Sequence, residues 1–369
     1  MLSPSNPVHS ATMLFTSAQH LIKWIHIAIS ALFVRLFYHP PQDWAKRKAE
    51  DGVVVWDALT SLLAYHGFIH CGRPEYKYLP PPPTTPPQNP YRPGADEDLI
   101  TRVTGRPPFM NTVVVRGTHI IGADRLGREV HIRAVRPDSQ ELRVLRCLTS
   151  RHLESDHNHT VPVICIFDVH EWTVVVQPYW GFWWDEPPLP SRARHLQVAR
   201  ELLEGLSFMH SQGISHGDIH SGNILISHED RRARPRRDAE FRVAFIDFES
   251  SAIFPLDAVD HIVKGDDLPT VPPAHIRAPE QEHDKESWDA FKTDVYNLGR
   301  CLQLSWLTKE LEEIQPLIDL LSAMTKSEPD KRPTSTEAHD LIEEMLKELP
   351  DDDVRPLEKE QAEVSRSGG

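Results

Sequence analysis

The chain has 369 residues, with 40 basic against 54 acidic side chains and a formal net charge of −14, which argues against nucleic-acid binding because phosphate backbones are bound by basic surfaces. Hydrophobic residues make up 40% and charged residues 25%, the composition of a globular protein and not of a disordered chain. The four cysteines are scattered without a C-x-x-C pair, which argues against a disulfide scaffold or a zinc knuckle and predicts an intracellular, cytoplasmic protein.

The first predicted element is an apolar helix over residues 20–37. Its uncharged run, between Lys23 and Arg35, is eleven residues long, whereas a membrane span needs about 20. Polar residues recur at helical spacing and predict one polar stripe: His20, Lys23, His26 and Ser30. The remaining face is wide and apolar. We expect the helix to pack on the main domain; the alternative is an interfacial anchor that gives a peripheral membrane contact through residues 20–37.

A proline-rich stretch follows, in which eight of the fifteen residues from 80 to 94 are proline. Proline lacks a backbone N–H and has a fixed φ, so this composition predicts a stiff, extended spacer. It divides the chain into an N-terminal extension (1–79), a linker (80–95) and a main domain (96–349). Residues 350–369 are charged and end in Ser-Gly-Gly, which is typical of a disordered tail.

The chemistry is concentrated in the segment 214–226, which reads I-S-H-G-D-I-H-S-G-N-I-L-I. Asp218 precedes Asn223 by five residues on a short loop that runs into an apolar strand. Such a loop can direct a carboxylate at a substrate hydroxyl while a side-chain amide holds a metal ion. A second apolar strand, over 241–246, ends in Asp247, and a carboxylate at the end of a buried strand is well placed to bind Mg²⁺.

These two segments resemble the catalytic loop H-R-D-x-x-x-x-N and the D-F-G metal motif of the protein kinase superfamily. Residues 158–163, N-H-T-V-P-V, also resemble a stretch common in divergent fungal kinase-like proteins. Three further motifs of that family follow in order: A-P-E at 278–280, D-x-x-x-x-G at 294–299 and D-K-R-P-T at 330–334. The resemblance covers about 96–349. It implies an α+β, two-lobed kinase-like fold, with a small β-rich N-lobe over about 96–176 and a mainly helical C-lobe over about 181–349. It also implies an ion pair between Arg332 and Glu280.

The resemblance assigns the cofactor pocket as well. Arg133 stands where the family has its phosphate-binding lysine, and Glu141 stands at the helix C glutamate that pairs with that lysine. Gln177 falls at the gatekeeper position before the hinge. A proline follows it and removes one backbone donor, so the adenine of ATP would be bound by the neighbouring groups of Tyr179 and Trp180.

The implied roles follow those of the family. Asp218 would orient and deprotonate the hydroxyl of a protein substrate, Asn223 and Asp247 would hold Mg²⁺, and Arg133 would contact the phosphates of ATP. The sequence does not specify the substrate or a protein partner.

Four departures from the family pattern affect these roles. No G-x-G-x-x-G cradle is present, so backbone N–H groups would hold the phosphates less closely. Arg133 keeps the charge of the usual lysine but has a broader, forked head group. Glu249 replaces the glycine of D-F-G. Gly217 replaces the arginine of H-R-D, which normally binds an activation-loop phosphate.

Three functions therefore remain open. The first is a protein kinase that transfers the ATP γ-phosphate to a protein hydroxyl, serine or threonine by resemblance; the intact Asp218, Asn223 and Asp247 favour it. The alternative is a pseudokinase scaffold or binding module, which the altered N-lobe favours. The third is a small-molecule phosphotransferase, since H-G-D-I-H-S-G-N also resembles the loop of aminoglycoside-type kinases; that class lacks the elements that contain Glu280 and Arg332.

Overall fold

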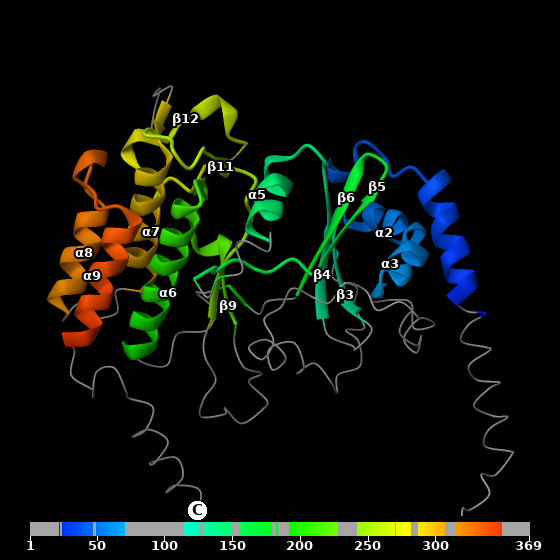
Figure 1. The fold of residues 1–369 in the computed structure, drawn as a ribbon, viewed down its shortest axis with the longest axis horizontal. Helices are drawn as coiled ribbons and strands as arrows, with labels where there is room; N and C mark the ends of the chain where they lie inside the picture. The colour runs from blue at the N-terminus through cyan, green and yellow to red at the C-terminus, as the bar shows by residue number, and fades with distance from the viewer. Residues whose placement is uncertain are drawn as a thin grey trace, which may run out of the picture. The chain divides into compact units, whose positions relative to one another are not determined.

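The computed structural model describes residues 22, 24–46, 49–70, 114–124, 129–149, 155, 157–178, 182–183, 192–227, 242–269, 271–281, 287–306 and 314–348. The chain divides into two compact units that mix helices and strands (Figure 1). The first contains the residues up to 137 together with 162–179, and the second contains 138–161 and the residues from 180 onward. The predicted linker and the predicted tail lie outside the described residues, as do Tyr179 and Trp180.

The first unit is built on an antiparallel sheet with the order β1-β3-β4-β6-β5, in which β2 also pairs with β3. Its strands are β1 (Phe68–His70), β2 (Val114–Arg116), β3 (His119–Asp124), β4 (Glu129–Val135), β5 (Cys165–Val169) and β6 (Trp172–Pro178). Every residue of β6 is buried, as expected for a valine-rich strand between two neighbours. Arg133 lies on β4 and Gln177 lies on β6.

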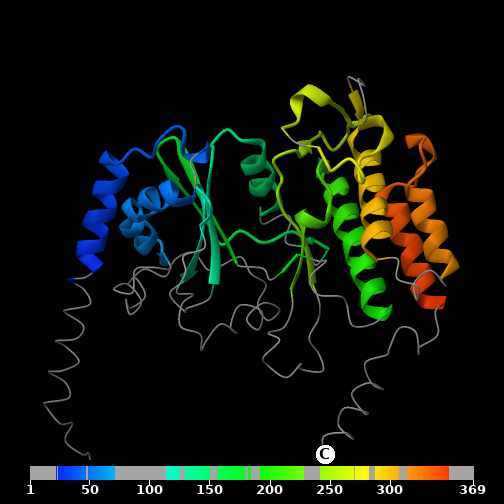
Figure 2. The same ribbon diagram turned by 180° about the vertical axis from the view of Figure 1, so that it is seen from behind.

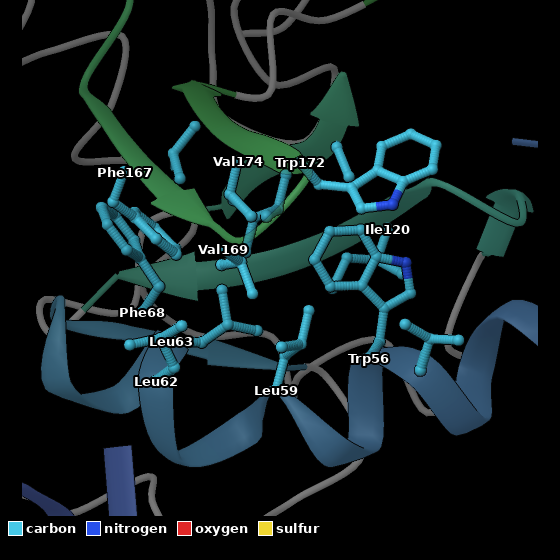
Figure 3. Close-up of a cluster of buried hydrophobic side chains, with 14 of the residues drawn as sticks. Trp56, Leu59, Leu62, Leu63, Phe68, Ile120, Phe167, Val169, Trp172 and Val174 are labelled. Atoms are coloured by element: carbon cyan, nitrogen blue, oxygen red, sulfur yellow. The ribbon is translucent and has the colours of Figure 1, made fainter. Parts of the chain in front are cut away.

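Two helices of the N-terminal extension, α2 (Ala49–Ala58) and α3 (Thr60–Tyr65), cover this sheet. Figure 3 shows their apolar side chains, among them Trp56, Leu59 and Leu63, directed at the strands. The indole N–H groups of Trp44 and Trp56 both donate to the carbonyl oxygen of Gly117, at 2.7 and 3.1 Å. The two tryptophans are thereby fixed to the turn between β2 and β3.

The compact unit therefore begins well before residue 96, where the sequence predicts the start of the main domain. β1 belongs to the extension, yet it pairs with β3 and so completes the same sheet. The physical reason is that Trp56, Leu59 and Leu63 would be exposed in a separate extension, whereas on the sheet they are at most 1% exposed.

The predicted N-terminal helix is present over residues 24–37 and is the darkest blue helix in Figures 1 and 2. Trp24 and Ile27 pack with Ala64 of α3, and Ala31 belongs to the core under the sheet. Packing of this helix is thus confirmed for one of its sides. None of the helices among the described residues is long and apolar enough to cross a membrane.

The second unit is mainly helical. Its helices are α5 (Gln140–Leu148), α6 (Arg192–Ser211), α7 (Ala290–Trp306), α8 (Gln315–Met324) and α9 (Ser335–Glu348). The last four lie side by side in both views (Figure 1, Figure 2). Short antiparallel pairings connect β7 (Phe182–Trp183), β9 (Ile224–Ser227) and β10 (Arg242–Phe245), then β8 (Ile214–Ser215) with β11 (Ala252–Ile253), and β12 (Ile262–Lys264) with β13 (Ser287–Asp289). Short 3₁₀ helices span Trp44–Lys46 in the first unit and Ser221–Asn223, Gly265–Asp267, Pro279–Gln281 and Pro329–Lys331 in the second.

Candidate functional site

The loop between β8 and β9 is held by one buried carboxylate. Asp294, on α7, has no exposed surface. Its two oxygens accept hydrogen bonds from the backbone N–H groups of His216, at 2.7 Å, and Gly217, at 2.9 Å. The Nε2 atom of His210 lies 3.1 Å from the same carboxylate, and Ser335 holds the other ring nitrogen of His210 at 2.9 Å. Charge-assisted hydrogen bonds of this kind are strong, so α7 fixes the backbone just before Asp218.

Two hydrogen bonds connect the three residues predicted to carry the chemistry. The side-chain amide of Asn223 donates to the carbonyl oxygen of Asp218 at 2.9 Å. The backbone N–H of Ile246 donates to the carbonyl oxygen of Asn223 at 3.0 Å. Ile246 directly precedes Asp247, so the structure brings Asp218, Asn223 and Asp247 together in one part of the second unit.

His216 lies beneath this group and is fully buried. Burial lowers the pKa of its imidazole, although the carboxylates of Asp294, Asp218 and Asp247 oppose the change. A neutral ring matches its contacts. Nε2 lies 3.0 Å from the carbonyl oxygen of Ile246 and so donates, while Nδ1 accepts from the backbone N–H of Asp218 at 3.3 Å. A neutral imidazole has one donor and one acceptor nitrogen, so His216 connects the Asp218 loop to the segment that follows β10 without adding a charge.

Asp247 has a left-handed backbone, with φ of +65°. Few residues other than glycine adopt this conformation, although aspartate tolerates it better than most. Strained backbone of this type costs about 1–3 kcal/mol and occurs often at functional sites. Its neighbours hold it in place, because Ile246 is hydrogen-bonded to Asn223 and Phe248 is buried, with its ring 5.2 Å from that of His216.

Gly217 also has a left-handed backbone, with φ of +80°. A Cβ at this position would lie 2.1 Å from the carbonyl oxygen of Ser250, well inside the contact distance of a carbon and an oxygen atom. The site where the family has an arginine therefore has no room for any side chain in this structure. Glycine is thus the residue that this backbone accepts.

We expect Gly217→Ala to lower the free energy of unfolding by more than about 3 kcal/mol, because the added methyl group meets backbone that cannot move aside cheaply. Gly67→Ala is the matched control. Gly67 also has a positive φ, of +89°, but a Cβ there would meet nothing within 4 Å, so the cost should be only about 1–2 kcal/mol of backbone strain. Urea denaturation of both variants measures the difference. Equal losses would show that the contact with Ser250 does not restrict position 217.

The donor set fits the ion that the resemblance implies. Mg²⁺ prefers oxygen ligands and is commonly held by one or two carboxylates together with substrate phosphates. Asp247 offers a carboxylate, and Asn223 offers an amide oxygen, since its amide nitrogen is the atom directed at Asp218. Among the described residues there is no group of three or more His, Cys, Asp or Glu side chains that could hold a metal ion. Binding of Mg²⁺ by Asn223 and Asp247 stays a prediction.

The residues predicted to contact the nucleotide fall in both units. Arg133, on β4 opposite Val175 of β6, is 7% exposed. Gln177 is 6% exposed, on the same pair of strands. Arg133 is thus not a surface residue of its strand. Glu141, in the first turn of α5, is buried in the second unit, so its pairing with Arg133 stays a prediction.

The predicted ion pair between Arg332 and Glu280 is confirmed. The Nη2 atom of Arg332 donates to Oε2 of Glu280 at 2.8 Å, and Nη1 donates to the other carboxylate oxygen. Arg332 also donates to the carbonyl oxygens of Lys326, Lys292 and Ser327 at 2.7, 3.0 and 3.2 Å. The pair is buried and its hydrogen bonds are satisfied, as a buried pair requires.

Sequence reasoning located the motif that contains Asp294 but not the function of this residue. Sequence reasoning also missed His210 and Ser335, which lie on two other helices and form a hydrogen-bonded chain with Asp294. The available signal was a single acidic residue at the start of 294–302, a segment with apolar residues at helical spacing, because a buried carboxylate must find hydrogen-bond donors.

No protein-family model matches the chain. A stretch of 123 residues is 30% identical to a protein of Arabidopsis thaliana named leaf rust 10 disease-resistance locus receptor-like protein kinase-like 1.3. The match covers 32% of this chain and 15% of that protein. This similarity gives a coarse indication of a relationship to protein kinases.

Proposed function

We propose that the chain is a protein kinase-like phosphotransferase with a two-lobed fold, which binds ATP with Mg²⁺ and transfers the γ-phosphate to a protein hydroxyl. The observation that carries the proposal is the hydrogen-bonded group of Asp218, Asn223 and Asp247. The buried pair of Arg332 with Glu280 supports it, because the resemblance required this contact between two distant motifs. The partial similarity to a receptor-like protein kinase points in the same direction.

The proposed chemistry assigns one role to each side chain. The Asp218 carboxylate orients the substrate hydroxyl and accepts its proton as the substrate oxygen bonds to the γ-phosphorus. The bond between the γ-phosphorus and the β,γ-bridging oxygen breaks in the same step, and ADP leaves with that electron pair. Mg²⁺, when bound by Asn223 and Asp247, would neutralise charge on the phosphates. Asp294 and His216 keep the loop in place, so that little reorganisation is needed during the reaction. Arg133 supplies a positive charge toward the phosphates.

The first prediction from this proposal concerns Mg²⁺. ATP affinity of the full chain should rise at least about tenfold when Mg²⁺ is added, and Asp247→Asn should remove most of that gain because it deletes a charged ligand. Isothermal titration with and without Mg²⁺ measures both. Asp257→Asn is the control, since Asp257 is exposed and should leave the gain unchanged. Equal ATP affinity with and without Mg²⁺ in the parent protein would contradict the assignment of Asn223 and Asp247.

A pseudokinase is the second candidate, and specific features favour it. The chain has no G-x-G-x-x-G segment, and the cation on β4 is a buried arginine instead of a lysine. A guanidinium cannot occupy the position of an ammonium without moving the phosphates, and a displacement of about 1 Å can cost a factor of ~10² in rate.

Transfer of radiolabelled γ-phosphate to a generic protein substrate separates the two candidates. An active enzyme should lose transfer in Asp218→Asn and in Arg133→Ala, and Arg133→Lys should raise it because the ammonium fits the family's geometry. Asp218→Asn serves as the blank. If the transfer rates of the parent protein and of Arg133→Lys both equal that of the blank, the chain is not a phosphotransferase. The pseudokinase would then be the function to adopt.

A further inference from the structure

The N-terminal helix exposes a continuous apolar stripe. Seven large hydrophobic side chains on it are each 50–65% exposed: Ile22, Ile25, Ile29, Leu32, Phe33, Leu36 and Phe37. Each of them has another member three or four residues away, so they lie on one side of the helix over about 22 Å. The rings of Phe33 and Phe37 are 4.8 Å apart and extend the stripe at its C-terminal end. A contiguous apolar surface of this kind marks an interaction site in soluble proteins.

The opposite side of the helix is occupied. Trp24, Ile27 and Ala31 are buried against the first unit. The sequence predicts a single apolar face, but the structure divides the apolar residues into a packed side and an exposed side. At about 100° per residue, the exposed stripe spans an arc of about 140°. Because the packed side fixes the helix to the unit, the stripe is held outward.

The charge of the N-terminal segment indicates which kind of partner binds the apolar stripe. The chain carries 54 acidic residues, yet none occurs before Asp43, while Lys23 and Arg35 both lie in the N-terminal segment. Arg35 is exposed on the same helix. A locally cationic segment of a protein with net charge −14 is complementary to an anionic surface. A second copy of the helix fits less well, because a coiled-coil seam is narrower and needs about three or four heptads.

We propose that residues 22–37 bind the surface of an anionic lipid bilayer, with the helix in the plane of the interface and the apolar stripe among the upper acyl chains. Stable interfacial binding requires buried apolar area together with attraction to anionic headgroups, and this helix supplies both. The helix lies on the first unit, so binding would place that unit at the membrane. The proposal goes beyond phosphotransfer and does not depend on it.

The test is sedimentation of the full chain with vesicles of phosphatidylcholine, either pure or with about 30 mol% phosphatidylserine. The parent protein should bind the anionic vesicles at least about threefold more tightly than the neutral ones. The triple variant Leu32→Gln, Phe33→Gln, Leu36→Gln should lower binding at least about tenfold. The matched control changes three exposed apolar residues of the second unit, Leu256→Gln, Val259→Gln and Ile262→Gln, which are 76%, 91% and 52% exposed, and should bind like the parent.

Three outcomes would overturn the proposal: no binding of the parent to either vesicle, unchanged binding of the helix variant, or an equal loss in the control. Sedimentation velocity can give a fourth outcome that overturns the proposal. If the parent is a dimer that does not bind vesicles, and the helix variant is a monomer, the stripe binds a second copy of the chain. If the triple variant does not fold, the single variant Phe33→Gln is tested instead. It should bind anionic vesicles about threefold more weakly than the parent, and unchanged binding would contradict the proposal.

Discussion

Replacing Glu280 with alanine is expected to lower the free energy of unfolding by about 3–5 kcal/mol, because it leaves the buried guanidinium of Arg332 without its counter-charge. The three backbone carbonyls around Arg332 cannot replace a carboxylate, since they carry no net charge. With an unfolding entropy of about 2.1 cal/mol/K per residue over 369 residues, the loss corresponds to a melting temperature lower by roughly 4–6 °C. Calorimetry or urea denaturation of Glu280→Ala and Arg332→Ala measures it.

The chain contains a matched surface pair for comparison. Lys331 and Glu328 are 3.1 Å apart, with side chains 63% and 58% exposed. Water and salt screen such a pair, so Glu328→Ala should leave the melting temperature unchanged within error. The double variant Glu280→Ala, Arg332→Ala should recover part of the loss, because neither buried charge then remains. Melting temperatures unchanged in both single variants would exclude a stabilising role for the buried pair.

The second large effect is expected at Asp294. Asp294→Ala removes the acceptor for two buried backbone N–H groups and the carboxylate that contacts Nε2 of His210. Each buried donor left unsatisfied costs about 1–3 kcal/mol, so a loss of about 3–5 kcal/mol is expected, together with loss of any Mg²⁺-dependent ATP binding as the loop before Asp218 is released. Asp294→Asn should lose less, because the amide oxygen still accepts one bond. Denaturation and ATP titration measure the two effects.

Asp289, which directly precedes α7, is the control for that experiment. Its carboxylate also accepts two backbone N–H groups, those of Phe291 at 2.9 Å and Lys292 at 3.0 Å, but at a helix start that is only partly buried. Loss of such a helix cap costs about 1 kcal/mol, and ATP binding should not change. If Asp289→Ala and Asp294→Ala destabilise equally, the contact of Asp294 with the loop contributes nothing beyond an ordinary cap.

The second unit was the more predictable part of the molecule. Short motifs located Asp218, Asn223 and Asp247, and the resemblance to the protein kinase superfamily implied the contact between Arg332 and Glu280. These predictions work because each motif is a local backbone geometry with its own hydrogen bonds. The roles of His210 and Ser335 were not predictable, because their contacts join helices that are far apart in the sequence.

The first unit was less predictable, for a different reason. Composition alone suggested that the proline-rich stretch separates an extension from a domain. Strand pairing between β1 and β3 is a long-range contact that no local pattern encodes. Likewise, the apolar pattern of the N-terminal helix does not say which of its apolar residues pack and which face outward. Trp24 and Phe33 are both large and apolar, yet one is buried and the other is 63% exposed.

The pairing of β1 and β2 with the same strand changes the meaning of the segment between them. β1 ends at His70 and β2 begins at Val114, and both are hydrogen-bonded to β3. The residues on the two sides of the proline-rich segment therefore pair with one and the same strand, and they belong to one compact unit. The entropy of closing a loop grows only with the logarithm of its length, about 0.6 kcal/mol for a doubling. The segment could therefore be lengthened, shortened or cut, because β1 and β2 would both stay paired with β3.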